Sequence, residues 1–263
     1  MNTKDKKVVI VLPAFNAEKT LLRTLAEIPP EYREHIILVD DCSRDQTTQI
    51  AKEAGLIVFS HEVNRGYGAN QKTCYTQALA MGADIVVMVH PDHQYDATVI
   101  PEMVQPILDE KADAVFGSRM LGGKPLEGGM PWWKYDANIF LTSLANIVFR
   151  RYLTEIHSGF RAYSRKYLET VWFEKNSDDF VFDTQIIAQG MANNLFFEEV
   201  PIVTRYFPEA SSINLARSIK YGFGILGVLL RYSLHKSGLL HFKVFAPKLG
   251  SIPISPVTHQ QPT

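Results

Sequence analysis

The sequence lacks the features that mark disulfide-rich, secreted and membrane-embedded proteins. It has two cysteines, Cys42 and Cys74, in 263 residues, too few for a disulfide framework or a four-thiolate metal site. Its apolar runs at 8–12 and 221–230 are shorter than the roughly twenty residues of a spanning helix. The first run is also too short for a signal-peptide core. We therefore expect a globular protein of a reducing, cytoplasmic compartment.

Two glycine-rich phosphate-binding patterns are also absent. The turn after the first apolar run reads PAFNAEKT, without the glycines that let a backbone approach a dinucleotide pyrophosphate, which disfavours a nicotinamide oxidoreductase. The sequence has no G-x-x-x-x-G-K-S/T loop, so a phosphate-loop NTPase is disfavoured too. The G-x-G at 66–68, in the third predicted turn, is equally typical of a tight turn.

The charge is nearly balanced overall but sorted along the chain. From Arg205 to the C-terminus there are seven Lys or Arg against one acid, a net charge of +6, which leaves −7 for the rest of a chain whose total is −1. A basic, apolar C-terminal third favours an anionic lipid surface as partner, whereas nucleic-acid proteins are usually basic throughout. A solvated basic tail is the alternative.

Short apolar runs alternate with helical patterns over the first half of the chain. Strands are predicted at 8–12, 36–39, 56–60, 85–89 and 114–116, and helices at 17–28, 46–54, 68–81 and 99–111. Further along, the pattern indicates helices at 135–152 and 182–191 and a strand at 196–200. Strands and helices in alternation predict an α/β fold with a doubly wound, mostly parallel sheet.

Polar residues follow each of the first five predicted strands. They are Asn16, then Asp40 and Asp41, then Asn64, Arg65 and Gly66, then His90 and Asp92, and finally Ser118 and Arg119. In doubly wound sheets the carboxyl ends of the strands face the ligand, so these residues are expected at one site. The oxygen and nitrogen donors of segment 90–96 suit Mg²⁺ or Mn²⁺ bridging to a diphosphate, and less well a zinc ion on its two histidines.

Taken together, the motifs resemble one known family. In order they read LPAFNAEKT, VDDCSRDQT, NRGYGAN, HPDHQYD, FGSR, SGFRAYSR, FVFDTQ and VPIVTRYFPEASS. The series, over roughly residues 7 to 235, resembles the inverting family 2 glycosyltransferases of GT-A fold. Within that family it is similar to the dolichol-phosphate mannosyltransferase-like branch, which acts on polyprenyl phosphates.

The resemblance implies a nucleotide-sugar site and a metal site. The nucleotide sugar would be held by Pro13, Ala14, Phe15, Asn16, Glu18, Asp40, Asp41, Asn64, Gly66 and Gly68. The family's acidic metal motif, Asp-x-Asp-x-Gln, falls on residues 90–94. Asp92 and Gln94 match as ligands of Mg²⁺ or Mn²⁺, while His90 replaces the first carboxylate and is a ligand only by hypothesis.

The resemblance also implies an acceptor site and catalytic residues. The acceptor phosphate would be bound by Arg119, Lys134, Arg161 and Arg205. Asp92, Arg161 and Asp183 would be the catalytic residues. Gln185 stands where relatives often carry Glu, which leaves open whether any side chain acts as a base.

The implied reaction is inverting transfer of a sugar from a UDP- or GDP-sugar to a polyprenyl phosphate, with no role for nucleic acid. A phosphate acceptor needs no general base. A hydroxyl acceptor would need one, with Asp183 as first candidate, and a catalytically silent nucleotide-sugar binding protein is a further alternative.

The predicted organisation is a catalytic domain at 1–212 followed by a basic amphipathic extension at 213–263. Aromatics at 132–133 and basic residues interleaved with Ile225, Leu226, Leu229 and Leu230 suggest a peripheral contact with the inner face of the membrane. The alternative is that this helix packs on the core of the domain itself.

Overall fold

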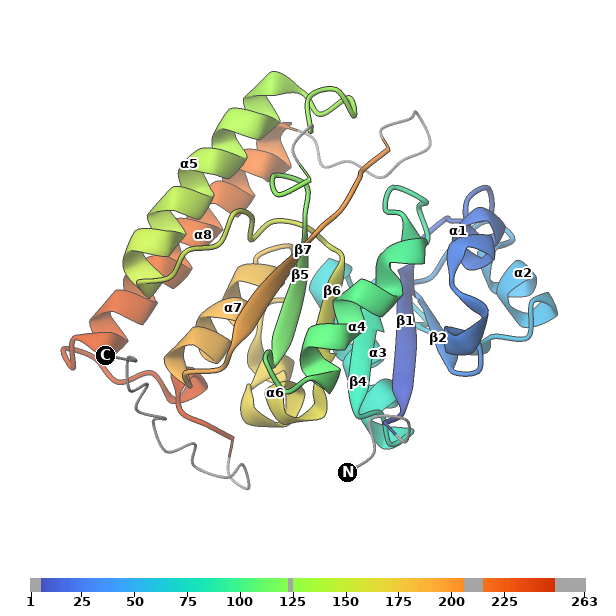
Figure 1. The fold of residues 1–263 in the computed structure, drawn as a ribbon, viewed down its shortest axis with the longest axis horizontal. Coiled ribbons are helices and arrows are strands. Elements are labelled where there is room, and N and C mark those ends of the chain that lie inside the picture. Colours follow the sequence, from blue (N-terminus) through green and yellow to red (C-terminus); the bar gives the residue numbers. More distant parts are fainter. Residues whose placement is uncertain (1–5, 123–124, 206–214, 249–263) are drawn as a thin grey trace.

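The computed structural model describes residues 6–122, 125–205 and 215–248 as one α/β fold (Figure 1). The strands are β1 (Val8–Ala14), β2 (Ile36–Asp40), β3 (Ile57–Ser60), β4 (Ile85–Met88), β5 (Ala114–Ser118), β6 (Arg161–Ser164) and β7 (Phe197–Pro201). The helices are α1 (Leu21–Glu27), α2 (Thr47–Glu53), α3 (Tyr67–Ala80), α4 (Ile100–Leu108), α5 (Trp132–Phe149), α6 (Arg165–Thr170), α7 (Phe182–Ala192) and α8 (Leu215–Lys236). The predicted boundary at 212/213 lies outside the described residues.

The sheet has seven strands in the order β3-β2-β1-β4-β6-β5-β7. All neighbours pair in parallel except β6, which runs antiparallel between β4 and β5. The doubly wound, mostly parallel sheet is therefore confirmed. The sequence analysis did not identify β6, because its residues RAYS are too few and too polar to form an apolar run.

Two apolar layers cover the sheet, one on each face. Along β1, Val9 and Val11 join the layer formed with α3, α5, α7 and α8, while Ile10 and Leu12 join the layer formed with α1 and α4. This is why the central strands read as uninterrupted apolar runs, since successive side chains enter opposite layers. Figure 1 shows α4 in front of the sheet and α3 behind it.

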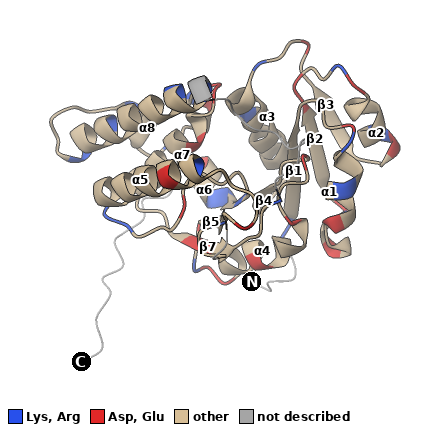
Figure 2. Cartoon of the chain, turned by 90° about the horizontal axis from the view of Figure 1, so that it is seen from above, with Lys and Arg blue, Asp and Glu red and all other residues tan. Residues whose placement is uncertain are grey.

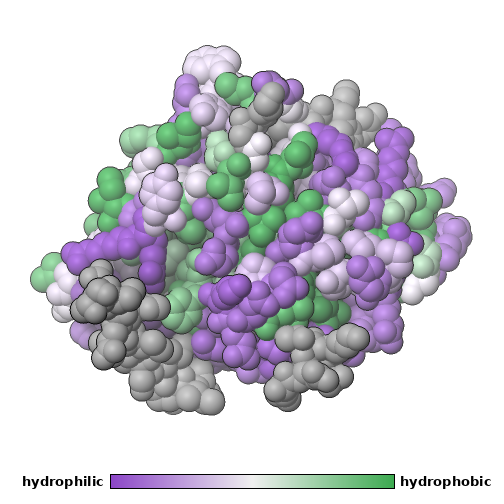
Figure 3. Space-filling model, in the orientation of Figure 1, coloured by the Kyte–Doolittle hydropathy of each residue, from purple (hydrophilic) through white to green (hydrophobic). Residues whose placement is uncertain are grey.

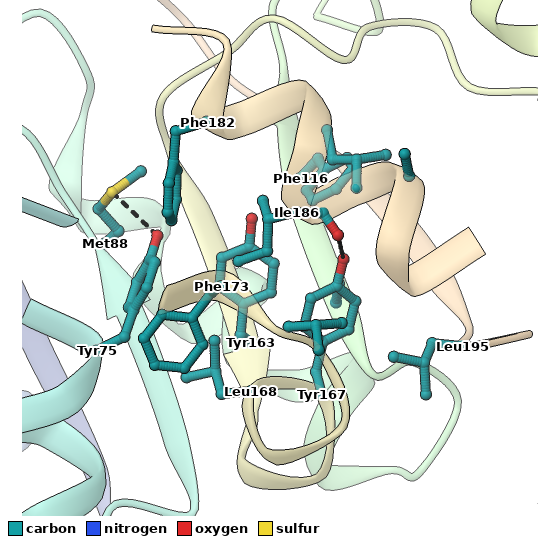
Figure 4. Close-up of a cluster of buried hydrophobic side chains, with 14 of the residues drawn as sticks. Tyr75, Met88, Phe116, Tyr163, Tyr167, Leu168, Phe173, Phe182, Ile186 and Leu195 are labelled. Atoms are coloured by element: carbon teal, nitrogen blue, oxygen red, sulfur yellow. Dashed lines mark hydrogen bonds between the residues drawn. The ribbon is translucent and has the colours of Figure 1, made fainter. Parts of the chain in front are cut away.

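Tyrosines fill much of the first layer, and the hydroxyls of Tyr75 and Tyr167 have partners inside it. The Tyr75 hydroxyl lies 3.3 Å from the Met88 sulfur, and the Tyr167 hydroxyl donates to the Ile186 carbonyl at 2.9 Å (Figure 4). These contacts offset the cost of burying the phenol oxygens. The first contact joins α3 to β4, and the second joins α6 to α7.

Helix α8 packs against α5 and α7, and Figure 1 shows α5 and α8 side by side beyond β7. Ile225 and Leu229 are buried in the first layer, whereas Leu226 and Leu230 are exposed. One face of α8 therefore belongs to the core, as the alternative prediction proposed, and another apolar face points outward. Among the helices of the described residues, none is both long and apolar enough to cross a bilayer.

Candidate active site

A cavity of about 1300 Å³ lies at the carboxyl ends of the parallel strands. Most of the predicted site residues line it: Pro13, Ala14, Phe15, Asp41, Asn64, Gly66, His90, Asp92, Gln94, Arg119, Lys134 and Asp183. The first turns of α3, α5 and α7 also reach the cavity. Helix N-termini carry partial positive charge, so their convergence makes the cavity favourable for phosphate groups.

Asp41 lines the cavity but is engaged by the protein itself. Its carboxylate accepts hydrogen bonds from the backbone N–H groups of Arg65 at 2.8 Å and Gly66 at 2.9 Å. Its Oδ1 also lies 2.7 Å from Nδ1 of His61, whose other nitrogen contacts the Thr73 hydroxyl at 2.9 Å. Asp41 therefore fixes the turn that leads into α3, a role that the sequence analysis missed together with His61.

Three side chains predicted to contact the nucleotide accept hydrogen bonds from the protein itself. Asn16 Oδ1 accepts from the Arg44 N–H at 2.9 Å, Glu18 Oε2 accepts from the Gln46 N–H at 3.0 Å, and Asp40 Oδ2 accepts from the Ser43 N–H at 3.0 Å. These side chains lie outside the cavity lining and join the turn after β1 to the turn after β2. Their carboxylate and amide oxygens satisfy backbone N–H groups that would otherwise lack partners.

The glycines at 66 and 68 permit a close approach of two protein segments. Gly66 has φ of +97°, and a Cβ on it would lie 2.7 Å from the Asp178 carbonyl oxygen. The Gly68 N–H donates to that carbonyl oxygen at 2.8 Å, and Gly68 itself lies outside the cavity lining. Gly68 therefore packs against segment 177–178, a contact that the sequence analysis did not identify.

The predicted metal motif lies on the turn after β4. The Asp92 Oδ1 accepts from the Gln94 N–H at 3.1 Å, and both side chains line the cavity. Within the described ranges, no group of three His, Cys, Asp or Glu is arranged to hold a metal ion. Two oxygen-bearing side chains are sparse ligation, which fits an ion such as Mg²⁺ or Mn²⁺ that takes its other ligands from water and substrate phosphates.

His90 is packed among protein groups. Its ring stacks on Tyr67 with centroids 5.6 Å apart, and its Nε2 lies 3.5 Å from the Tyr67 hydroxyl. A Cβ on Gly159 would lie 2.6 Å from that nitrogen, so a glycine is needed there. Burial lowers the pKa of His90 and favours the neutral imidazole.

Arg161 was predicted to bind the acceptor phosphate, and the structure places its side chain among internal partners. Its side chain is 1% exposed, and its Nη1 lies 3.1 Å from Oδ1 of Asp183. Its Nε and Nη2 donate to the carbonyl oxygens of Ser158 at 2.8 Å and Ile156 at 3.1 Å. The guanidinium therefore contacts groups inside the protein and lies outside the cavity lining.

Asp183 lines the cavity, and both of its oxygens have protein partners. Oδ1 accepts from Gln71 at 3.1 Å besides its contact with Arg161, and Oδ2 accepts from the Tyr67 hydroxyl at 2.9 Å. Tyr67 thus joins Asp183 to the ring of His90. Its place in the NRGYGAN motif was the only signal in the sequence that could have found it.

Arg205, also predicted to bind the acceptor phosphate, contacts two other segments of the protein. Its Nη1 lies 2.8 Å from Glu27 Oε1, and its backbone N–H donates to the Gln94 carbonyl oxygen at 2.9 Å. It lies outside the cavity lining and ties the turn that carries Asp92 to α1. Its role in the described structure is to hold that turn.

Arg119 and Lys134 remain as predicted cations inside the cavity. Burial lowers the pKa of Lys134, and the neighbouring charge of Arg119 lowers it further. Both cations therefore line the same cavity. Arg119 also contacts Glu155, a buried carboxylate that the sequence analysis missed.

Comparison with known proteins identifies the family of this chain. A family model described as glycosyl transferase family 2 matches residues 9–172. The chain belongs to this family. Family 2 glycosyltransferases are transferases, so the cavity at the strand ends is the candidate active site of a glycosyltransferase.

Individual relatives extend over most of the chain. It is 32% identical to an uncharacterized protein of Methanocaldococcus jannaschii, over 86% of this chain and 92% of the relative. It is 28% identical to UDP-N-acetylglucosamine–dolichyl-phosphate N-acetylglucosaminyltransferase of Methanococcus voltae, over 88% and 98%. Glucosyl-3-phosphoglycerate synthase of Mycobacterium tuberculosis, in complex with UDP, shares the GT-A fold with a TM-score of 0.66 at 18% identity, over 88% and 81% of the two chains.

Proposed function

We propose that this glycosyltransferase transfers a sugar, with inversion, from a nucleotide-diphosphate donor to a polyprenyl phosphate. The observation that carries the proposal is the layout of the cavity. One end is formed by the turns after β1 and β2, and the other by Arg119 and Lys134 beside apolar residues of the segment that leads into α5. A donor and an anionic, lipid-linked acceptor would therefore meet within one cavity.

The donor would occupy the end formed by Pro13, Ala14, Phe15 and Asn64. Phe15 is half exposed, which leaves its ring open to a nucleoside base, while Asp41 keeps the adjoining turn in place. The Methanococcus voltae relative is named for a UDP-sugar donor, and this supports UDP over GDP. The diphosphate would point toward the helix N-termini and the turn of Asp92.

Asp92 and Gln94 would hold Mg²⁺ or Mn²⁺ through their side-chain oxygens. Such an ion, when bound, neutralises charge on a leaving diphosphate. A solved Mycobacterium tuberculosis synthase of the same fold holds Mn²⁺ with UDP-glucose, which supports this assignment. Nε2 of His90 faces Tyr67 and Gly159. His90 would therefore either pack beside the metal site or bind the ion through Nδ1.

The acceptor phosphate would bind between Arg119 and Lys134 and attack the anomeric carbon in line with the departing diphosphate. A phosphate oxygen is already anionic near neutral pH, so no side chain has to remove a proton. The state of Asp183 agrees with this, because Arg161, Gln71 and Tyr67 engage both carboxylate oxygens. A hydroxyl acceptor would require this carboxylate to leave its partners.

A membrane surface would present the acceptor to the cavity. On α8, Ile219, Phe223 and Leu230 are more than half exposed, and on α5 Phe140 and Ile147 are exposed as well. Figure 3 shows apolar side chains along α5, and Figure 2 marks basic residues near both ends of α8. Exposed apolar side chains flanked by Lys and Arg favour an interfacial contact with anionic lipid, here proposed for the inner face of the membrane.

The test is transfer of radiolabelled sugar from UDP-N-acetylglucosamine to farnesyl phosphate with Mn²⁺, followed by extraction into organic solvent. We expect label in the organic phase with farnesyl phosphate and none with farnesol. Transfer to farnesol or to a soluble glycan would favour a hydroxyl acceptor. A protein that binds the nucleotide sugar but releases no more UDP than Asp92→Ala in any mixture would instead be a catalytically silent binding protein.

A further inference from the structure

One buried carboxylate fixes both the side chain and the backbone of Arg119. Glu155, in the loop between α5 and β6, is 0% exposed. Its Oε1 accepts from the Arg119 Nε at 2.8 Å and also contacts Nη2, while its Oε2 accepts from the Arg119 backbone N–H at 2.8 Å. Burial alone would raise the pKa of Glu155, but the charge and hydrogen bonds of Arg119 outweigh it and lower that pKa.

Glu155 is itself held from two other elements. The Asn138 side chain of α5 donates to Oε1 at 2.6 Å. Glu199 of β7 accepts from the Glu155 N–H at 2.9 Å and from the Thr154 N–H at 2.7 Å. The carboxylate thus has a fixed position relative to both α5 and the sheet, and it passes this position on to Arg119.

We propose that Glu155 is a positioning residue for the acceptor phosphate, which it orients through Arg119; this rests on the proposed function. A guanidinium binds phosphate through a planar fork of donors, so its orientation decides how many hydrogen bonds it makes. Glu155 contacts Nε and Nη2 of this fork and also holds the backbone, so the guanidinium has a fixed orientation at the wall of the cavity. Its negative charge weakens the anion site, and the fixed geometry outweighs that effect.

The test is equilibrium binding of farnesyl phosphate in detergent micelles to the full chain with UDP and Mn²⁺. In Glu155→Gln an NH2 group replaces one of the two accepting oxygens, so one donor of Arg119 faces another donor and the guanidinium loses its fixed direction. We expect the Kd for farnesyl phosphate to rise about tenfold, the effect of losing a hydrogen bond to a charged group. The Kd for UDP alone should stay at the wild-type value.

Asp113→Asn is the matched control. Asp113 is also a buried carboxylate, lies at the opposite end of β5, pairs with Lys166 at 3.0 Å and accepts from the Phe196 N–H at 3.0 Å. It resembles Glu155 in burial and bonding but is remote from the cavity. We expect Asp113→Asn to lower thermal stability and to leave the Kd for farnesyl phosphate unchanged.

A double-mutant cycle separates positioning from general stability. If Glu155 acts through Arg119, adding Glu155→Gln to Arg119→Ala causes no further weakening. Additive effects, an unchanged Kd in Glu155→Gln, or tighter binding from the removed negative charge would each overturn the proposal. If Glu155→Gln does not fold, Asn138→Ala removes one donor to Glu155, and an unchanged Kd in that variant overturns the proposal equally.

Binding to the wild-type protein distinguishes an error in the proposed acceptor from an error in the role of Glu155. If it binds UDP but no farnesyl phosphate, the proposed acceptor is wrong, and this role of Glu155 fails with it. If it binds farnesyl phosphate and Glu155→Gln binds it equally well, only the positioning role is wrong.

Discussion

Replacing Arg161 by alanine tests whether this arginine is structural. The change removes the 3.1 Å contact with Asp183 and two hydrogen bonds to the carbonyl oxygens of Ser158 and Ile156. Asp183, 8% exposed, would be left as a buried charge without its cation. Removing one partner of a buried ion pair costs about 3–5 kcal/mol. That is a large part of the roughly 5–15 kcal/mol by which a typical protein is stable.

Urea unfolding followed by far-UV circular dichroism measures this cost. We expect the free energy of unfolding of Arg161→Ala to fall by about 3–5 kcal/mol. Lys220→Ala is the control, because Lys220 forms an exposed ion pair with Asp179 at 2.7 Å that is worth about 0–1 kcal/mol. The double variant Arg161→Met with Asp183→Leu should recover most of the stability, since no unpaired charge stays buried.

Two results would contradict a structural role for Arg161. If Arg161→Ala unfolds within about 1 kcal/mol of the wild type, the buried pair does not carry the stability assigned to it. If the same variant also loses farnesyl phosphate binding and keeps UDP binding, Arg161 reaches the acceptor after all.

Three further predictions follow from local geometry. Burial lowers the pKa of His157 from 6.5 to about 4, so below pH 6.5 the unfolded chain binds more protons and stability falls toward pH 4 by up to about 1.4 kcal/mol per unit. Urea unfolding of His157→Gln should show a shallower decline. Gly68→Ala would place a Cβ against the Ser177 carbonyl oxygen and should cost about 1–3 kcal/mol, whereas Gly227→Ala, with open space around it, should stabilise α8 slightly. Phe223→Glu should reduce co-sedimentation with anionic vesicles and leave the unfolding midpoint unchanged, and equal sedimentation would contradict the proposed membrane contact.

Four of the strands that were predicted correctly share one physical property. Residues of β1, β2, β4 and β5 are buried on both faces of the sheet, so their sequences are continuous apolar runs. Strand β6 is equally buried but begins with Arg161, whose charge is neutralised by Asp183 from a distant helix. A pairing of residues so far apart in the chain leaves no local pattern.

The location of the site was predictable, but the roles of its polar residues were not. Strand order alone brings the polar turns to one edge of the sheet. An aspartate or asparagine in such a turn can either bind a ligand or satisfy backbone N–H groups, and both roles use the same residue types. Asp40 and Asn16 take the second role, and only the three-dimensional arrangement of the two turns reveals it.

The arginines and lysine assigned to phosphate from sequence divide into three groups by their partners. Arg161 neutralises Asp183 inside the fold, and Arg205 holds the turn of the metal motif against Glu27. Arg119 and Lys134 line the cavity, where Glu155 offsets part of the charge. Two cations and one carboxylate leave a net positive charge, which an acceptor phosphate bound there would neutralise. Selectivity for an anionic acceptor over a neutral prenol would then follow from burial of the site, because a partly desolvated cation pair gains more from a phosphate than from a hydroxyl.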